Sequence, residues 1–177
     1  MWKKQLRIIS GGQTGVDRAA LDFALHYGIS CGGYCPKGRK AEDGPIPDIY
    51  PLKELLSERY SDRTKRNIEV SDGTLIFKTG SGLDRGTNLT LEYCKKQNKP
   101  CFIYSLAKDQ VNPYEDLYKW IENHGIVTVP YRASFAKKSK NLTGKVLNIA
   151  GNRESFSPGI YRLVYETLVR FYHDYLS

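Results

Sequence analysis

Short apolar runs alternate with helix-like segments along the 177 residues of this chain. The first run, at residues 6–10, predicts a strand. After Gly15, apolar residues recur three and four positions apart, which predicts a helix with one buried face. Gly28 is suited to end that helix in the left-handed conformation. Four further strands are predicted, at residues 29–35, 74–78, 101–105 and 145–150.

Helices are predicted between most of these strands, an alternation typical of a parallel sheet covered by helices. They are expected at residues 16–27, 51–70 (in two pieces), 86–97, 113–124 and from 157 onward. The expected fold class is therefore α/β, a doubly wound and mainly parallel sheet with helices on both faces. The length suits a single domain over residues 1–177, and no apolar run is long enough to span a membrane.

Three glycine-containing loops follow predicted strands, so they should meet at one edge of the sheet, where α/β proteins bind ligands. The first loop consists of Gly11, Gly12, Gln13, Thr14 and Gly15. Its glycines would let backbone N–H groups approach an oxyanion, and the helix that follows would add the positive end of its dipole. The alternative is a turn that only packs the strand against the helix.

The second loop, at residues 80–87, includes Gly82 and leads into a helix that begins near Gly86 and Thr87. Three glycines in seven residues exceed what an ordinary loop requires, so we interpret it as a second anion-binding loop. The third loop follows residue 150 and contains Arg153, whose planar guanidinium suits phosphate.

A mixed-charge loop at residues 36–47 contains Lys37 and Arg39. Long loops of this kind are often functional. Its cations would either help to close the loop over a phosphate or form internal ion pairs of little energetic value.

Catalytic signals are weak. Glu92 is an acid/base candidate, and Asp17 would orient a ribose hydroxyl or only favour the helix N-terminus. Neither a Walker A loop nor GxGxxG is present, which argues against a Mg-dependent NTPase and an ordinary NAD enzyme. The three histidines and four cysteines lack metal-ligand spacing, so no metal site is expected.

The net charge of +8 permits anionic cofactors, nucleotides or nucleic acid as partners. Much of the basic excess lies near the C-terminus, and the segment 131–145 contains Lys137, Lys138 and Lys140. A solvated basic surface is the favoured interpretation, because residues 137–140 stand alone without an aromatic base-stacking pattern. Nucleic-acid binding is the less favoured alternative.

The chain resembles the molybdenum carrier protein family of the wider lysine-decarboxylase-like, cytokinin-activating (LOG) Rossmann group. The resemblance rests on residues 11–17 (GGQTGVD), 35–44 (CPKGRKAEDG), Arg63-Thr64 with Asn67, 71–74 (SDGT), Gly86-Thr87 with Thr90, and 150–155 (AGNRES). It spans nearly the whole chain, with an apparent insertion at residues 126–144.

The resemblance implies a Rossmann-like sheet, a homo-oligomer and binding of molybdenum cofactor (molybdopterin) or a nucleotide. The expected function is thus a cytoplasmic carrier for a phosphorylated pterin or nucleotide-like anion. The predicted ligand-binding residues are Gly11, Gly12, Gln13, Thr14, Gly15, Lys37, Arg39, Gly82, Gly86, Thr87 and Arg153. The alternative is a nucleotide N-glycosidase that uses Glu92 or Asp17, although the full Pro-Gly-Gly-x-Gly-Thr-x-x-Glu pattern of such relatives is absent.

Overall fold

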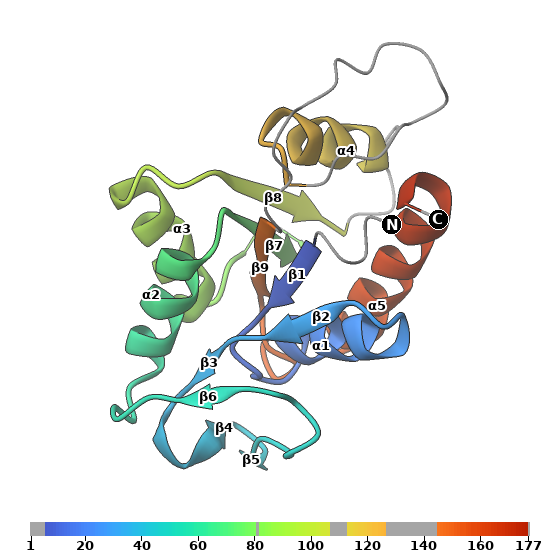
Figure 1. The fold of residues 1–177 in the computed structure, drawn as a ribbon. Coiled ribbons are helices and arrows are strands. Elements are labelled where there is room, and N and C mark those ends of the chain that lie inside the picture. The colour runs from blue at the N-terminus through green and yellow to red at the C-terminus, as the bar shows by residue number, and fades with distance from the viewer. Residues whose placement is uncertain (1–5, 81, 107–112, 127–144, 177) are drawn as a thin grey trace.

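The computed structural model describes residues 6–80, 82–106, 113–126 and 145–176. At its centre is a five-stranded sheet in the order β2-β1-β9-β7-β8 (Figure 1). All neighbouring strands in it are parallel. The strands are β1 (Leu6–Ile9), β2 (Ser30–Gly32), β7 (Gly73–Lys78), β8 (Cys101–Ser105) and β9 (Lys145–Gly151). This sheet confirms the α/β fold predicted from the sequence.

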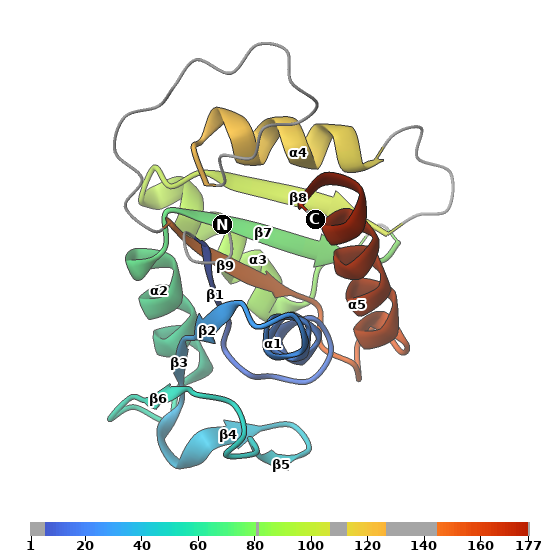
Figure 2. The same cartoon turned by 45° about the vertical axis from the view of Figure 1, so that its right-hand side comes forward.

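Helices cover both faces of the sheet, as Figure 2 shows. One face carries α1, α4 and α5, and the other carries α2 and α3, which pack against each other. The helices are α1 (Val16–His26), α2 (Tyr60–Val70), α3 (Arg85–Lys96), α4 (Pro113–Asn123) and α5 (Ile160–Phe171), followed by a π-helical turn at Tyr172–Leu176.

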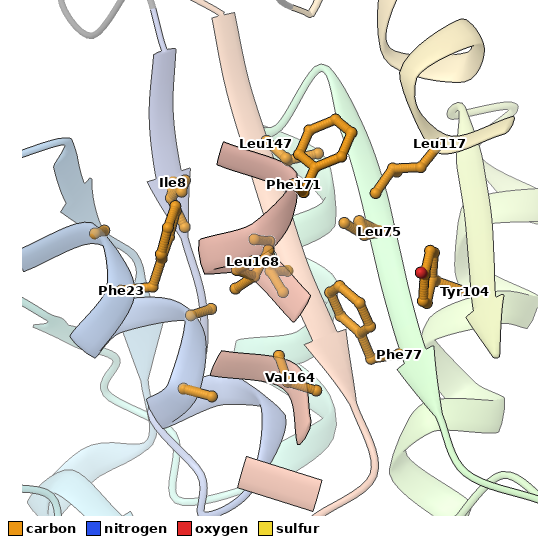
Figure 3. Close-up of a cluster of buried hydrophobic side chains, with 14 of the residues drawn as sticks. Ile8, Phe23, Leu75, Phe77, Tyr104, Leu117, Leu147, Val164, Leu168 and Phe171 are labelled. Atoms are coloured by element: carbon orange, nitrogen blue, oxygen red, sulfur yellow. The ribbon is translucent and has the colours of Figure 1, made fainter. Parts of the chain in front are cut away.

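The larger hydrophobic core lies between the sheet and helices α1, α4 and α5. Leu147 and its strand neighbours contact Phe23 of α1, Leu117 of α4 and Leu168 of α5 there (Figure 3). Burying a side chain of this size contributes about 1.5–3 kcal/mol. Because side chains alternate along a strand, Asn148 points to the opposite face, towards α2 and α3.

The strand order places the last strand in the middle of the sheet. If β9 and α5 preceded β1, the strands would read 3-2-1-4-5, the order of a doubly wound fold. The direction of winding then reverses between β9 and β7. The carboxyl ends of these two strands are therefore where such a fold binds its ligand.

Two local predictions were wrong. The predicted strand at 29–35 is broken at Gly33 into β2 and β3 (Tyr34–Cys35). Gly33 has φ 128°, and a Cβ there would lie 2.1 Å from the Ser10 carbonyl oxygen. The predicted helix at 51–70 begins only at Tyr60, because β6 (Lys53–Glu54) pairs with β3 instead.

The mixed-charge loop forms a small hairpin of β4 (Lys40–Ala41) and β5 (Gly44–Pro45) beside the main sheet (Figure 1). Apart from Ile126, the predicted insertion at 126–144 lies outside the described residues, as do Lys137, Lys138 and Lys140. The single-domain prediction therefore stays a prediction. No helix in the described ranges is long and apolar enough to cross a membrane.

Candidate functional site

A cavity of about 820 Å³ lies at the carboxyl ends of β1, β7 and β9. Its walls come from α2, from the first two turns of α3 and from the loops after these strands. The lining residues that matter most here are Gly11, Gln13, Asp17, Arg63, Thr87 and Arg153. A cavity of this size suits a small organic ligand or cofactor.

The wall formed by the sheet is polar because β9 presents Asn148 to the cavity. Asn148 is only 3% exposed, and its Nδ2 donates to Thr74 Oγ1 at 3.3 Å. A polar amide in the centre of a parallel sheet is unusual, since such strands are normally apolar on both faces. The amide therefore gives the cavity a hydrogen-bonding group where packing alone would favour an aliphatic residue.

A buried ion pair joins α1 to α2 across one end of the cavity. Arg63 Nη1 donates to Asp17 Oδ2 at 2.5 Å, and the two side chains are 14% and 5% exposed. Arg63 Nε is buried and has no partner among the described residues. A Cβ on Gly11 would overlap this guanidinium, at 1.3 Å from Nη1, so a side chain there would have to displace Arg63 from its present position.

The start of α3 forms the facing wall. Asp84 caps the helix by accepting from Thr87 N at 2.7 Å, and it also accepts from Arg153 N at 3.2 Å. Asn152 Oδ1 in turn accepts from Asp84 N at 3.1 Å, which ties the loops after β7 and β9 together. Thr87 Oγ1 is buried without a partner in the described part of the chain.

Hydrogen bonds within the chain use several N–H groups of the first glycine loop. Gln13 N donates to Asp17 Oδ2 at 3.2 Å, and Thr14 N donates to Gln13 Oε1 at 3.0 Å. Val16 N donates to the Asn152 carbonyl at 3.3 Å. Gly15, at φ 75°, lets this contact form, because a Cβ there would lie 2.7 Å from that carbonyl oxygen. The loop is thus closely packed against the loop after β9.

Glu42, in the turn between β4 and β5, joins the mixed-charge loop to both of these loops. Its carboxylate accepts from Thr14 Oγ1, from Ser155 N at 3.2 Å and from Ser155 Oγ at 2.5 Å. Arg153 Nε lies 3.6 Å away. Although partial burial opposes it, these hydrogen bonds hold the pKa of Glu42 below its ordinary value.

Replacing Glu42 by Gln is expected to lower the free energy of unfolding at pH 7 by about 1 kcal/mol and to have a smaller effect at pH 3. Because the folded-state pKa lies below the ordinary value of 4.5, the stabilisation is complete above that value and is lost as the pH falls through the folded-state pKa. Urea unfolding of both proteins at the two pH values measures this. Asp48→Asn, at a 98% exposed ion-pairing side chain, is the control. An equal loss at both pH values would contradict the prediction.

Residues 8–134 match the circularly permutated YpsA SLOG family. The chain belongs to this family. It is also similar to the crystal structure of a "Putative molybdenum carrier protein" from Syntrophus aciditrophicus SB, with 38% identity over 94% of this chain and 95% of that chain, and a TM-score of 0.79. The search of curated proteins found no match. These findings confirm the resemblance identified from the sequence, and the central position of β9 agrees with a permuted SLOG chain.

In this SLOG chain, the predicted site residues fall into two groups. Those that line the cavity are Gly11, Gln13, Gly86, Thr87 and Arg153, together with Asp17 and Glu92. Those that do not line it are Gly12, Thr14, Gly15, Lys37, Arg39 and Gly82. No observation tests ligand binding by either group, so the binding roles stay predictions.

The second group has other contacts. Arg39 donates to the carbonyls of Ile46 and Pro47, both at 2.7 Å, and of Tyr50 at 3.0 Å, which holds the mixed-charge loop in shape. Gly12, at φ 77°, packs against Ile46. The side chain of Lys37, in the same loop, is exposed.

The cavity also contains a face of α2 to which sequence reasoning gave no role. Tyr60, Arg63, Thr64 and Asn67 follow the spacing i, i+3, i+4, i+7 of one helix face. That polar stripe was visible in the sequence, and three of its members belong to the segments that carry the resemblance. A polar helix face usually faces solvent, so the stripe alone does not indicate a cavity wall.

The cysteines Cys31, Cys35, Cys94 and Cys101 are all free thiols. Within the described ranges, no group of three or more His, Cys, Asp or Glu side chains is arranged to hold a metal. The lining residues of this SLOG cavity offer hydrogen bonding and charge from arginine, amide, hydroxyl and carboxylate groups.

Proposed function

We propose that this SLOG protein binds and carries a phosphorylated pterin or nucleotide-like anion in the cavity between α2 and α3. The observation that carries the proposal is that two residues lining this cavity each have a buried polar atom without a partner among the described residues, Arg63 Nε and Thr87 Oγ1. Leaving such groups unpaired costs about 1–3 kcal/mol each, so a ligand that satisfies both would recover this free energy.

The phosphate would bind at the start of α3. Asp84 already accepts from Thr87 N, so the phosphate would use the remaining N–H groups of the first turn of α3 and the positive end of its dipole. Thr87 Oγ1 and Arg63 Nε add side-chain donors, and Arg85 lines the same wall. Asp17 opposes an anion only weakly, because Arg63 already neutralises it.

This proposal moves the phosphate away from the first glycine loop, where the sequence predicted it. The N–H groups of Gln13, Thr14 and Val16 already donate within the chain. A phosphate would have to displace those bonds, whereas Arg63 Nε and Thr87 Oγ1 have no hydrogen bond within the described residues that a ligand would have to displace.

The family and the named neighbour support an organic anion such as molybdenum cofactor as the ligand. The molybdenum would arrive as part of that ligand. A nucleotide is the other member of the same chemical class. Homo-oligomeric assembly and a cytoplasmic location, both expected from the sequence and its resemblance, remain part of the proposal.

A thermal-shift panel tests binding. The panel contains inorganic phosphate, molybdate, AMP, GMP and a pterin phosphate. A ligand at about 100 times its Kd should add about 2.7 kcal/mol of stability, or about 5–10 °C for a chain of this size. Arg85→Gln should reduce the shift, whereas Arg66→Gln, an exposed change on α2 outside the cavity, should not. No shift with any compound would overturn the proposal.

The second candidate is an N-glycosidase, favoured by one observation, that Glu92 lines the same cavity. A carboxylate near the ribose of a bound nucleotide would serve as acid or base. Chromatography of the AMP and GMP mixtures decides between the two functions. Free base that disappears with Glu92→Gln would indicate an enzyme, and binding without base release would indicate a carrier.

A further inference from the structure

The Gln13 side-chain amide is held in one orientation at the cavity wall. Gln13 is 8% exposed and lines the cavity. Its Oε1 accepts from two backbone donors, Thr14 N and Glu42 N, both at 3.0 Å. A flipped amide would turn its own N–H groups against these donors and lose both bonds. Among the hydrogen bonds of the described residues, none uses Gln13 Nε2, so this donor is left for a ligand.

Glu42 supplies one of these two donors, and its side chain anchors its own backbone. The carboxylate is bound by Thr14 and Ser155, from the loops after β1 and β9. The next residue, Asp43, is held by Arg18 through two bonds of 2.5 and 2.7 Å. Glu42 does not line the cavity itself, so any effect it has on a ligand passes through Gln13 or Arg153.

The surroundings of Gln13 favour a neutral acceptor over an anion. The Glu42 carboxylate is anchored to Thr14, the residue next to Gln13. This carboxylate raises the cost of placing a phosphate against Gln13. A ring carbonyl oxygen needs only the N–H donor that Gln13 Nε2 offers.

We propose that Glu42 is a positioning residue that fixes the Gln13 amide so that its Nε2 donates to a ring carbonyl oxygen of the ligand. This inference rests on the proposed function, with the phosphate at the start of α3 and the heterocycle against Gln13. The ligand class it selects is a phosphorylated heterocycle with an oxo group on the ring, in preference to the same ring without it.

Isothermal titration with GMP and with 2-aminopurine riboside 5′-monophosphate, which lacks the ring carbonyl oxygen, tests the inference. The wild type should bind GMP about 5- to 10-fold more tightly, the factor expected for one hydrogen bond. Gln13→Met keeps a similar volume without the donor and should bring the ratio of the two Kd values to about 1. The ratio compares two ligands on one variant, so a partly unfolded sample does not change it.

Glu42→Gln should also lower this ratio, and Glu42→Asp, which keeps the charge, should restore part of it. Asp48→Asn removes a charge from the same loop and should leave the ratio at the wild-type value. If the wild type binds both compounds with equal Kd values, the inference is overturned and the proposed function stays intact. A ratio unchanged in Glu42→Gln would remove the positioning role. Absence of GMP binding would overturn the inference, and failure of the whole thermal-shift panel would overturn the proposed function as well.

Discussion

Replacing Arg63 by Met is expected to lower the free energy of unfolding by about 3 kcal/mol and to abolish ligand binding. Breaking a buried ion pair by removing one partner typically costs 3–5 kcal/mol, because the other charge stays buried and unpaired. Asp17, at 5% side-chain exposure, would be that charge. Urea unfolding at pH 7 measures the first effect, and the thermal-shift panel measures the second.

Arg66→Met is the matched control, since Arg66 is on the same helix and forms an exposed pair with Glu69. It should change stability by less than about 0.5 kcal/mol. Adding Asp17→Asn to Arg63→Met should recover at least about 1 kcal/mol, because no charge is then left unpaired. Additive effects of the two changes would contradict the pairing, and normal ligand binding by Arg63→Met would contradict the proposed site.

Replacing Gly15 by Ala is expected to lower the free energy of unfolding by about 3 kcal/mol or more. Gly15 has φ 75° and ψ −125°, a conformation that residues with a Cβ rarely adopt. A Cβ would also lie 2.7 Å from the Asn152 carbonyl oxygen and 2.8 Å from Glu154 N. Because these are backbone atoms, the two loops would have to separate. Urea unfolding measures the loss.

Gly28→Ala is the control that separates backbone strain from steric overlap of the new Cβ with neighbouring atoms. Gly28 also has positive φ, 64°, but a Cβ there would have nothing within 4 Å. It should cost only about 1 kcal/mol, the usual penalty for alanine in the left-handed region. Equal losses at the two positions would show that the overlap with Asn152 and Glu154 is unimportant.

The alternation of apolar residues was enough to predict the sheet and its helices, since a buried face requires the same spacing wherever the element lies. The apolar spacing did not predict the structure where one segment could form either a helix or a strand. Residues 53–54 pair with β3 in place of a helix, because β3 leaves the main sheet after Gly33 and offers a free edge. The sequence of residues 51–59 alone does not indicate that this strand edge is available for pairing.

Glycines and polar residues at strand ends predicted the edge of the sheet at which the cavity lies. They did not distinguish groups that face the cavity from groups that hold loops together. Arg39 and Thr14 have the same chemistry as a ligand-binding cation and hydroxyl, yet their partners are carbonyls of residues 46–50 and Glu42. Arg63 and Asn148 line the cavity, although neither lies in a glycine loop.

The sequence by itself determined the fold class, the helix and strand periodicities, the family and the edge of the sheet at which the cavity lies. All of these depend on local spacing or on short motifs that can be recognised in the sequence without knowledge of the fold. Tertiary structure alone decided that β9 enters the centre of the sheet, that Arg63 and Asp17 pair, and that Glu42 holds Gln13. These contacts join residues 29 or more positions apart, and whether a polar group meets a ligand or another part of the chain depends on which distant segment packs beside it.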